Sequence, residues 1–385
     1  MRPERGRLPI RSEILLALTL ALGLGRGVAA QDAQAAAKKT SVYEEIWKYT
    51  RLYDNGENPV IQRLALSGRF QLDYANVDSD QGDHHEWNIR RFRVGARARL
   101  FQKLTVHGEV ELNPQEHDPL YVRLTDIYVE WAENELVTAT VGKHSAPFTM
   151  DGATSSRELI AVDRSNLTNN LWFTQEYFPG MSLEGERGGF HYHAGLYSSG
   201  SRNREFGEFD GSVFGLVVVG YDLAKELGVK EAVLDLNYVH QGADEDNTFT
   251  QKFGNIVSVN FALRSGRWGL RADLSAGDGH LGQSDVYGVM AMPFVDFGRG
   301  FQLVGRYTFV ESDDVNGVRL GLYENQVVAD RGDEFHELYA GLNYYFYGHR
   351  LKLQTGLQFA DMDDRANDGG AYSGTSWTAG LRVGW

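Results

Sequence analysis

The last ten residues of the chain, 376–385, have the sequence SWTAGLRVGW. Every second residue from Trp377 to Trp385 is apolar, and the residues between them are small or polar. Successive side chains of a β-strand point to opposite faces. An apolar face opposite a polar one suits a strand with lipid on one side and water on the other. The stretch therefore predicts a transmembrane strand.

About sixteen segments from Leu64 onward have a strand-like pattern of this kind. Short connections alternate along the chain with long polar ones, at 76–86, 143–180, 199–211, 242–250, 312–333 and 362–372. An even number of strands with alternating short turns and long loops is typical of outer-membrane barrels. We expect an all-β fold in which residues 63–385 form a 16-stranded antiparallel transmembrane β-barrel. A soluble all-β domain is the less favoured alternative.

The composition excludes several other classes of protein. The chain has 385 residues with 44 Gly, no Cys and a formal net charge of −14. After the N-terminus it lacks the run of about 18 apolar residues that a membrane-spanning helix requires. Without Cys it can form neither disulfides nor thiolate metal sites. Its acidity argues against nucleic-acid binding.

The N-terminal region is expected to lie outside the barrel. Residues 1–30 combine a basic start, a short apolar stretch and a small-residue cleavage site, and are interpreted as a signal peptide for export. Residues 31–62 are expected to form a periplasmic segment. Within it, residues 41–53 predict a short helix with Ser41 as N-cap and Glu44 three residues later.

The second strand carries a column of arginines. Arg91, Arg93, Arg97 and Arg99 share one face, and small or apolar residues share the other. A guanidinium facing lipid costs about 2–4 kcal/mol near the midplane of the membrane, so these side chains are expected to face the lumen. Arg90 falls on the lipid side, unless it lies near the rim or a bulge turns it inward.

Two readings of this column remain open. Glu109 and Glu111 alternate in the same way on the next strand and could neutralise the arginines as salt bridges across the wall. If arginine is in excess there, the column instead draws anions through a pore by charge-assisted hydrogen bonds.

The longest connection, 143–180, is expected to be the third external loop and is too long to be a simple surface bridge between its neighbouring strands. We expect it to fold into the lumen and narrow the channel. It carries Lys143 and Arg157 among other charged residues. A mobile surface loop is the alternative.

Several motifs resemble those of the phosphate-selective porins O and P. They are Leu66-Ser67-Gly68-Arg69-Phe70, the pair Arg90-Arg91, Val141-Gly142-Lys143, Pro147-Phe148, Thr154-Ser155-Ser156 and Asp163-Arg164-Ser165, in a match from about Gln62 to Trp385. The resemblance implies a trimeric barrel with an arginine ladder and an anion site at the constriction. It assigns Arg90 and Arg91 to the constriction, Lys143 or Arg157 to the loop cation, and Arg69 and Arg93 to the ladder.

Together these observations predict an outer-membrane porin in which small anions, phosphate or polyphosphate among them, diffuse through a water-filled, Arg-lined channel. Its expected partners are those anions, outer-membrane lipid, lipopolysaccharide and two further copies of the chain. No catalytic residue, metal or cofactor is assigned, because His191 and His193 lack a third ligand in the sequence. The alternatives are a non-selective or weakly cation-preferring porin, in which carboxylates neutralise every lumen arginine, and an outer-membrane barrel enzyme or adhesin.

Overall fold

The computed structural model describes residues 41–385 apart from 117, 174–175, 200–212 and 246–250. The signal peptide expected at residues 1–30 lies outside the described residues. Contacts divide the chain into two compact units, one ending at Glu45 and one beginning at Ile46. Among the described residues, every helix is too short or too polar to cross a membrane.

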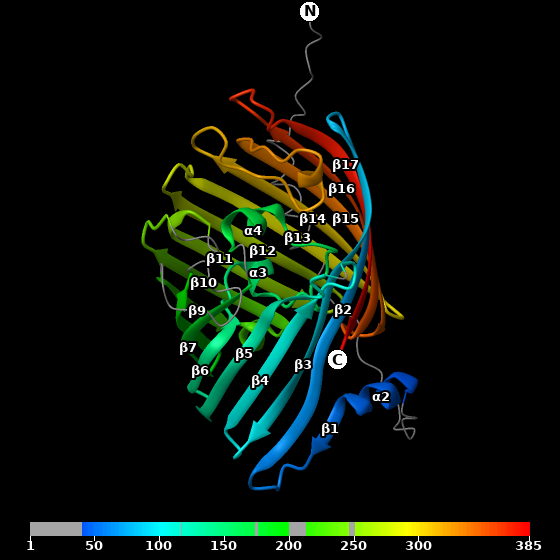
Figure 1. Cartoon of the computed structure of the whole chain (residues 1–385), viewed down its shortest axis with the longest axis vertical. Helices are drawn as coiled ribbons and strands as arrows, with labels where there is room; N and C mark the ends of the chain where they lie inside the picture. The colour runs from blue at the N-terminus through cyan, green and yellow to red at the C-terminus, as the bar shows by residue number, and fades with distance from the viewer. Residues whose placement is uncertain (1–40, 117, 174–175, 200–212, 246–250) are drawn as a thin grey trace, which may run out of the picture. The chain divides into compact units, whose positions relative to one another are not determined.

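The second unit is an antiparallel sheet closed into a ring (Figure 1). Each strand from β2 to β17 pairs with its neighbours in sequence, and β17 pairs with β2, which makes the expected ring of 16 strands. The strands are β2 (Ile61–Ser79), β3 (Gly82–Leu100), β4 (Leu104–Leu112), β5 (Tyr121–Asn134), β6 (Val137–Ser145), β7 (Tyr177–Arg187), β8 (Phe190–Ser198), β9 (Val213–Asp222), β10 (Glu231–Gln241), β11 (Phe253–Ser265), β12 (Trp268–Gly279), β13 (Val286–Gly298), β14 (Phe301–Ser312), β15 (Glu334–Tyr347), β16 (Leu351–Asp363) and β17 (Tyr372–Gly384).

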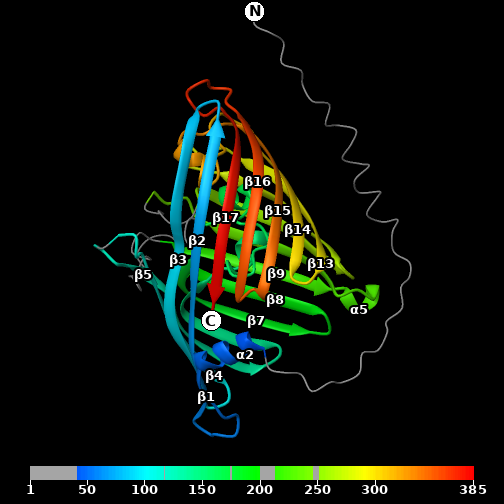
Figure 2. The same cartoon turned by 90° about the vertical axis from the view of Figure 1, so that its right-hand side faces the viewer.

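The seam between β2 and β17 closes the ring, and Figure 2 shows these two strands side by side. Its register runs from Gly374 opposite Ser79 to Gly384 opposite Arg69. Trp385 adds two further backbone hydrogen bonds to Gly68, of 3.1 and 3.2 Å. A side chain at position 68 would collide with the Arg93 carbonyl oxygen at 2.4 Å and the Trp385 ring at 2.6 Å, so this closure requires glycine.

The alternation that predicts the strands separates an apolar outer face from a polar inner one. On β12, Leu274 is 61% exposed, whereas its neighbour Asp273 is 1% exposed. Val141, Met181 and Leu338 are likewise more than half exposed. Such side chains fit a surface that lies in lipid, where apolar atoms need no cover.

The N-terminal prediction was correct at its start and wrong at its end. Ser41 and Glu44 cap each other's backbone amides, with N···O distances of 3.1 and 2.9 Å. However, the helix α2 (Val42–Trp47) is followed by a 3-10 turn, η2 (Lys48–Thr50), and by the strand β1 (Arg51–Asp54). β1 pairs with residues 63–65 of β2, where β17 has already ended, and so gives this edge its hydrogen-bond partners.

The long loop expected at 76–86 is instead an extension of the β2–β3 hairpin. The two strands stay paired up to Ser79 opposite Gly82, with a turn of only two residues between them. The prediction failed because Asn76, Asp78, Asp83 and His85 make the outward face of this stretch polar, while Ala75 and Val77 are buried on the inward face. A strand that extends beyond the lipid shows no apolar alternation.

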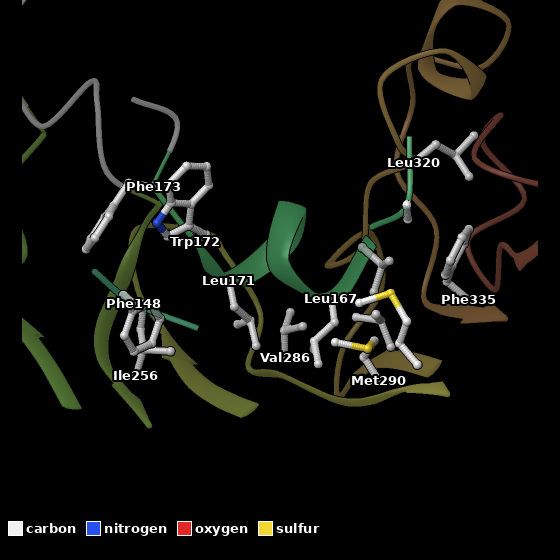
Figure 3. Packing of buried hydrophobic residues seen from close by; sticks show 14 of the residues in the cluster. Phe148, Leu167, Leu171, Trp172, Phe173, Ile256, Val286, Met290, Leu320 and Phe335 are labelled. Atoms are coloured by element: carbon white, nitrogen blue, oxygen red, sulfur yellow. The ribbon is translucent and has the colours of Figure 1, made fainter. Parts of the chain in front are cut away.

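Much of the space inside the ring is filled with apolar side chains. They come from the connection between β6 and β7, from the connection between β14 and β15, and from inward-facing positions of several strands. Figure 3 shows Leu167 and Leu171 packed towards Val286 and Met290 of β13. The lumen is therefore not uniformly water-filled, in contrast to the expectation from the sequence.

Candidate functional site: the inner segment and the charged walls of the lumen

Residues 146–176, here called the inner segment, connect β6 to β7 and include the short helices α3 (Met150–Ala153) and α4 (Asn166–Leu171). Both helices lie within the ring of strands in Figure 1. α4 begins where the side chain of Ser165 accepts a hydrogen bond from the amide of Thr168, as an N-cap. The connection is shorter than the 143–180 expected, because residues 143–145 belong to β6 and residues 177–180 to β7.

The backbone of the inner segment is tied to one wall of the barrel by side-chain donors. Arg306 of β14 donates to the carbonyl of Asp163 at 2.8 Å, and Arg382 of β17 donates to that of Val162 at 3.0 Å. Further donors to carbonyls 156–160 are Gln71 of β2, Asn343 of β15, and Lys352 and Gln354 of β16. Because carbonyls in a protein interior need partners, these donors substitute for regular secondary structure.

The opposite end of the inner segment is held by an ionic cluster around Glu176. Its carboxylate accepts from Arg91 at 2.7 Å, from Arg164 at 3.0 Å and from Arg93 at 3.2 Å. Burial opposes ionisation of Glu176, but the charges of Arg91, Arg164 and Arg93 outweigh burial, and its pKa lies well below the usual value. Arg93 also binds Glu111 at 3.3 Å. The two upper arginines of the column, Arg91 and Arg93, are thus bound to carboxylates.

A bulge decides the direction of Arg90. In the β2–β3 pairing, Gln71 faces Arg91 and Leu72 faces Ile89, so Arg90 is the extra residue. Its guanidinium lies 3.4 Å from the Asp163 carboxylate of the inner segment. Burial raises the pKa of Asp163, but the charge of Arg90 more than compensates, and the net effect lowers that pKa. Of the possibilities raised by the sequence, the bulge is the one found.

Arg69 and Arg157 lie together near the seam. Arg69 donates to the hydroxyl of Ser156 at 2.7 Å and lies 3.8 Å from the carboxylate of Glu109. Arg157 donates to the carbonyl of Trp385 at 3.4 Å. Burial and the positive charge of Arg69 lower the pKa of Arg157 below its usual value.

The lower arginines of the column differ from the upper ones. Arg97 bonds to the hydroxyl of Tyr128, and Arg99 bonds to the carbonyl of Gln102 at 2.9 Å. Both side chains are exposed. Within the part of the chain that the structure describes, neither forms an ion pair. The remaining expected cation, Lys143, is 2% exposed near the end of β6, where it has contacts of its own.

A second inward-folded connection was missed by sequence reasoning. Residues 313–333, between β14 and β15, were expected to form an external loop, but Leu320 and Tyr323 are buried. Arg319 bonds to α4, with its amide donating to Asn170 at 2.9 Å and its carbonyl accepting from Asn166 at 2.9 Å. The two connections therefore pack on each other within the barrel.

A cavity of about 510 Å³ remains beside the inner segment. It is lined by the inward faces of β6 to β11, by the β5–β6 turn, and by Pro147 and Ala153. His191 and His193 line it and point the same way, as their spacing predicts. Each has a carboxylate partner, Asp235 at 2.7 Å and Glu184 at 3.4 Å respectively. The carboxylates of this wall were also missed.

Comparison with known proteins shows to which family a chain with this architecture belongs. A sequence profile described as "Phosphate-selective porin O and P" matches residues 64–291, more than half of the chain. The chain belongs to this family. It is accordingly a porin of the outer membrane and not an enzyme. A search of curated protein sequences found no match.

Solved structures of bacterial porins are similar to this porin in fold. An anion-selective porin from Comamonas acidovorans has a TM-score of 0.58 at 13% identity, covering 84% of this chain and 99% of the other. A loop-deletion form of OmpT of Vibrio cholerae gives 0.56 at 13% identity, with 84% and 99% covered. The channel DcaP of Acinetobacter baumannii gives 0.54 at 13% identity, with 84% and 97% covered. At this identity the likeness shows the fold alone.

Proposed function

We propose that this porin is a diffusion channel that favours small anions, phosphate or polyphosphate among them, and that the inner segment narrows it. The observation that carries the proposal is the pair Arg97 and Arg99, which are exposed and form no ion pair in the described part of the chain. Arg157 adds a third guanidinium outside any described ion pair. An oxyanion can take bidentate hydrogen bonds from such groups.

The upper arginines have a different part in the proposal. Arg90, Arg91 and Arg93 bind carboxylates of the inner segment or the wall, which compensates most of their charge. They set the width of the channel by holding the inner segment in place. The guanidinium groups that form no ion pair then set the preference of the channel for anions over cations. In water-like surroundings, the attraction between one guanidinium charge and an anion 4 Å away is about 1 kcal/mol. This attraction increases the occupancy of the channel by anions roughly fivefold.

We also propose that the protein forms homotrimers in contact with outer-membrane lipid and lipopolysaccharide. Support comes from the family, and from the broad outer surface of exposed apolar side chains, which requires lipid or another copy as cover. Chemical cross-linking of the protein in native membranes tests this. A trimer band is expected, and a monomer alone would contradict the proposal.

The test of anion preference is the reversal potential of single channels in a KCl gradient. Arg97→Ala/Arg99→Ala should reduce the ratio of chloride to potassium permeability several-fold, because two open charges are lost. Arg187→Ala is the matched control, since Arg187 is an exposed cation at the end of β7 and lines no part of the cavity. An unchanged ratio in the double variant would contradict the proposal.

A weakly cation-preferring porin is the second candidate. Two observations favour it, namely the pairing of the upper arginines with carboxylates and the acidic cavity described above. The same measurement separates the two functions, because a reversal potential of the opposite sign in the unmodified channel would establish the cation preference.

A further inference from the structure

The cavity beside the inner segment has a strongly acidic wall. Four carboxylates line it, those of Glu135, Glu184, Glu186 and Asp235. Among the described residues that line it there is neither Lys nor Arg. The negative charge is therefore compensated only by imidazoles. This wall has the opposite sign to the open arginines of β3, and it is not used by the anion path proposed above.

The two imidazoles bind only two of the four carboxylates, so much of the negative charge is uncompensated. His191 binds Asp235, whose side chain is 25% exposed, and His193 binds Glu184, whose side chain is 53% exposed. In the described part of the chain, Glu135 and Glu186 form no ion pair. With neutral imidazoles the wall has a formal charge of −4. A cavity with walls of one sign concentrates counter-ions of the other.

Two buried amides at the cavity have unused hydrogen-bonding capacity. Asn237 and Asn260 are only 2% and 3% exposed, and both line the cavity. The Asn237 amide nitrogen donates to the Ser258 carbonyl at 3.4 Å, and the Asn260 amide oxygen accepts from the Ser258 hydroxyl at 2.8 Å. The Asn237 oxygen and the Asn260 nitrogen have no partner among the described residues. Neither atom is fully enclosed, so each is open to a hydrogen bond with a molecule in the cavity.

We propose that this cavity is a binding site for small organic cations, specifically short primary amines that also carry a hydroxyl group. The ammonium groups pair with the carboxylates of β7 and β10 and donate to the Asn237 oxygen. The hydroxyl accepts from the Asn260 nitrogen. The volume of about 510 Å³ lies in the range of 300–1,000 Å³ that is usual for small-molecule pockets. The proposal stands apart from the anion preference of the channel, because different walls carry the two.

The probe for this site is 1,3-diaminopropan-2-ol, and glycerol is its neutral control with the same carbon skeleton. Titration calorimetry on the full-length protein in detergent micelles should show saturable binding of the diamine and none of glycerol. Asp235→Asn combined with Glu184→Gln should weaken the diamine at least tenfold. Glu226→Gln combined with Glu245→Gln removes the same two charges from exposed positions outside the cavity lining and should leave the affinity unchanged.

Misfolding of the double variant could also abolish diamine binding, so a variant that should bind the diamine more tightly is needed as well. Thr138→Glu adds a carboxylate to the lining of the same cavity at a position with no assigned role in binding, and should tighten diamine binding about threefold. Equal binding of diamine and glycerol, or affinities unaffected by the cavity variants, would overturn the proposal. Calorimetry does not depend on conduction. A channel without anion preference that still binds the diamine would therefore refute only the proposed function.

Discussion

The carboxylate of Glu176 is predicted to fix the inner segment against the arginine wall, and Glu176→Gln tests this. The wild-type carboxylate binds three guanidiniums at 2.7–3.2 Å, and only 12% of its side chain is exposed. The glutamine keeps one acceptor oxygen but loses the charge, so Arg91, Arg93 and Arg164 then repel one another. Removing one partner of a buried ion pair costs about 3–5 kcal/mol.

Hydrogen exchange measured by mass spectrometry gives the readout. If the cost is confined to the inner segment, peptides from 146–176 should exchange about 100- to 4,000-fold faster in Glu176→Gln, since each 1.4 kcal/mol is about tenfold. Peptides from β9 to β12 should be unaffected. The uncompensated arginines should also increase the ratio of anion to cation permeability. Glu245→Gln is the control for loss of one exposed carboxylate.

The sign of the pH dependence follows from the lowered pKa of Glu176. Its charge stabilises the folded state fully above the pKa of the unfolded chain, about 4.3, and this contribution is lost only as the pH falls through the lower folded value. The protection factors of residues 146–176 against hydrogen exchange should therefore be equal at pH 7 and pH 5. Loss of protection at pH 5 in the wild type, or exchange in Glu176→Gln equal to that of the control, would refute the reasoning.

Three further outcomes test the rest of the structure. Leu167→Ala removes a fully buried side chain from the apolar packing inside the ring. It should lower the free energy of unfolding, measured in urea, by about 2–5 kcal/mol. The control Leu338→Ala, on the outer face, should lower it by less than about 1 kcal/mol in the same lipid. Leu274→Arg places a charge on the lipid-facing side of the barrel. If the position lies at the membrane midplane, the same unfolding experiment should show a loss of about 2–4 kcal/mol in the free energy of unfolding. An unchanged free energy would place Leu274 outside the lipid. Arg319→Ala removes the side chain that donates to the Asn169 carbonyl of α4 and should accelerate hydrogen exchange in 313–333; unchanged exchange would show that the two connections do not support each other.

The strands were predictable from the sequence because lipid imposes a simple rule on every second residue. The alternation in 376–385 and in β3 holds in the structure, and the arginine column faces inward as its cost in lipid requires. The direction of Arg90 could not be decided in advance. A bulge depends on how two strands are registered, and register is a property of the pair rather than of one strand.

The interior was harder to predict. The connection 313–333 looks polar in sequence, and its buried residues Val318, Leu320 and Tyr323 follow no regular spacing. Irregular segments have no period that would indicate burial. The donors that hold the inner segment had a usable signal, because Arg306 and Arg382 alternate with apolar residues and so lie at inward positions of their strands. The acidic cavity gave no such signal, since its carboxylates come from separate strands.

The seam between β2 and β17 has a consequence for how the molecule assembles. These strands lie at opposite ends of the barrel sequence, so their pairing must wait until every strand between them exists. Contacts so distant along a chain form slowly, and until they form both strands present bare edges that readily pair with other chains. Biogenesis of this protein should therefore depend on factors that shield β2 and β17 during that interval. The glycine at position 68, which admits Trp385, is then a requirement of the final joining step.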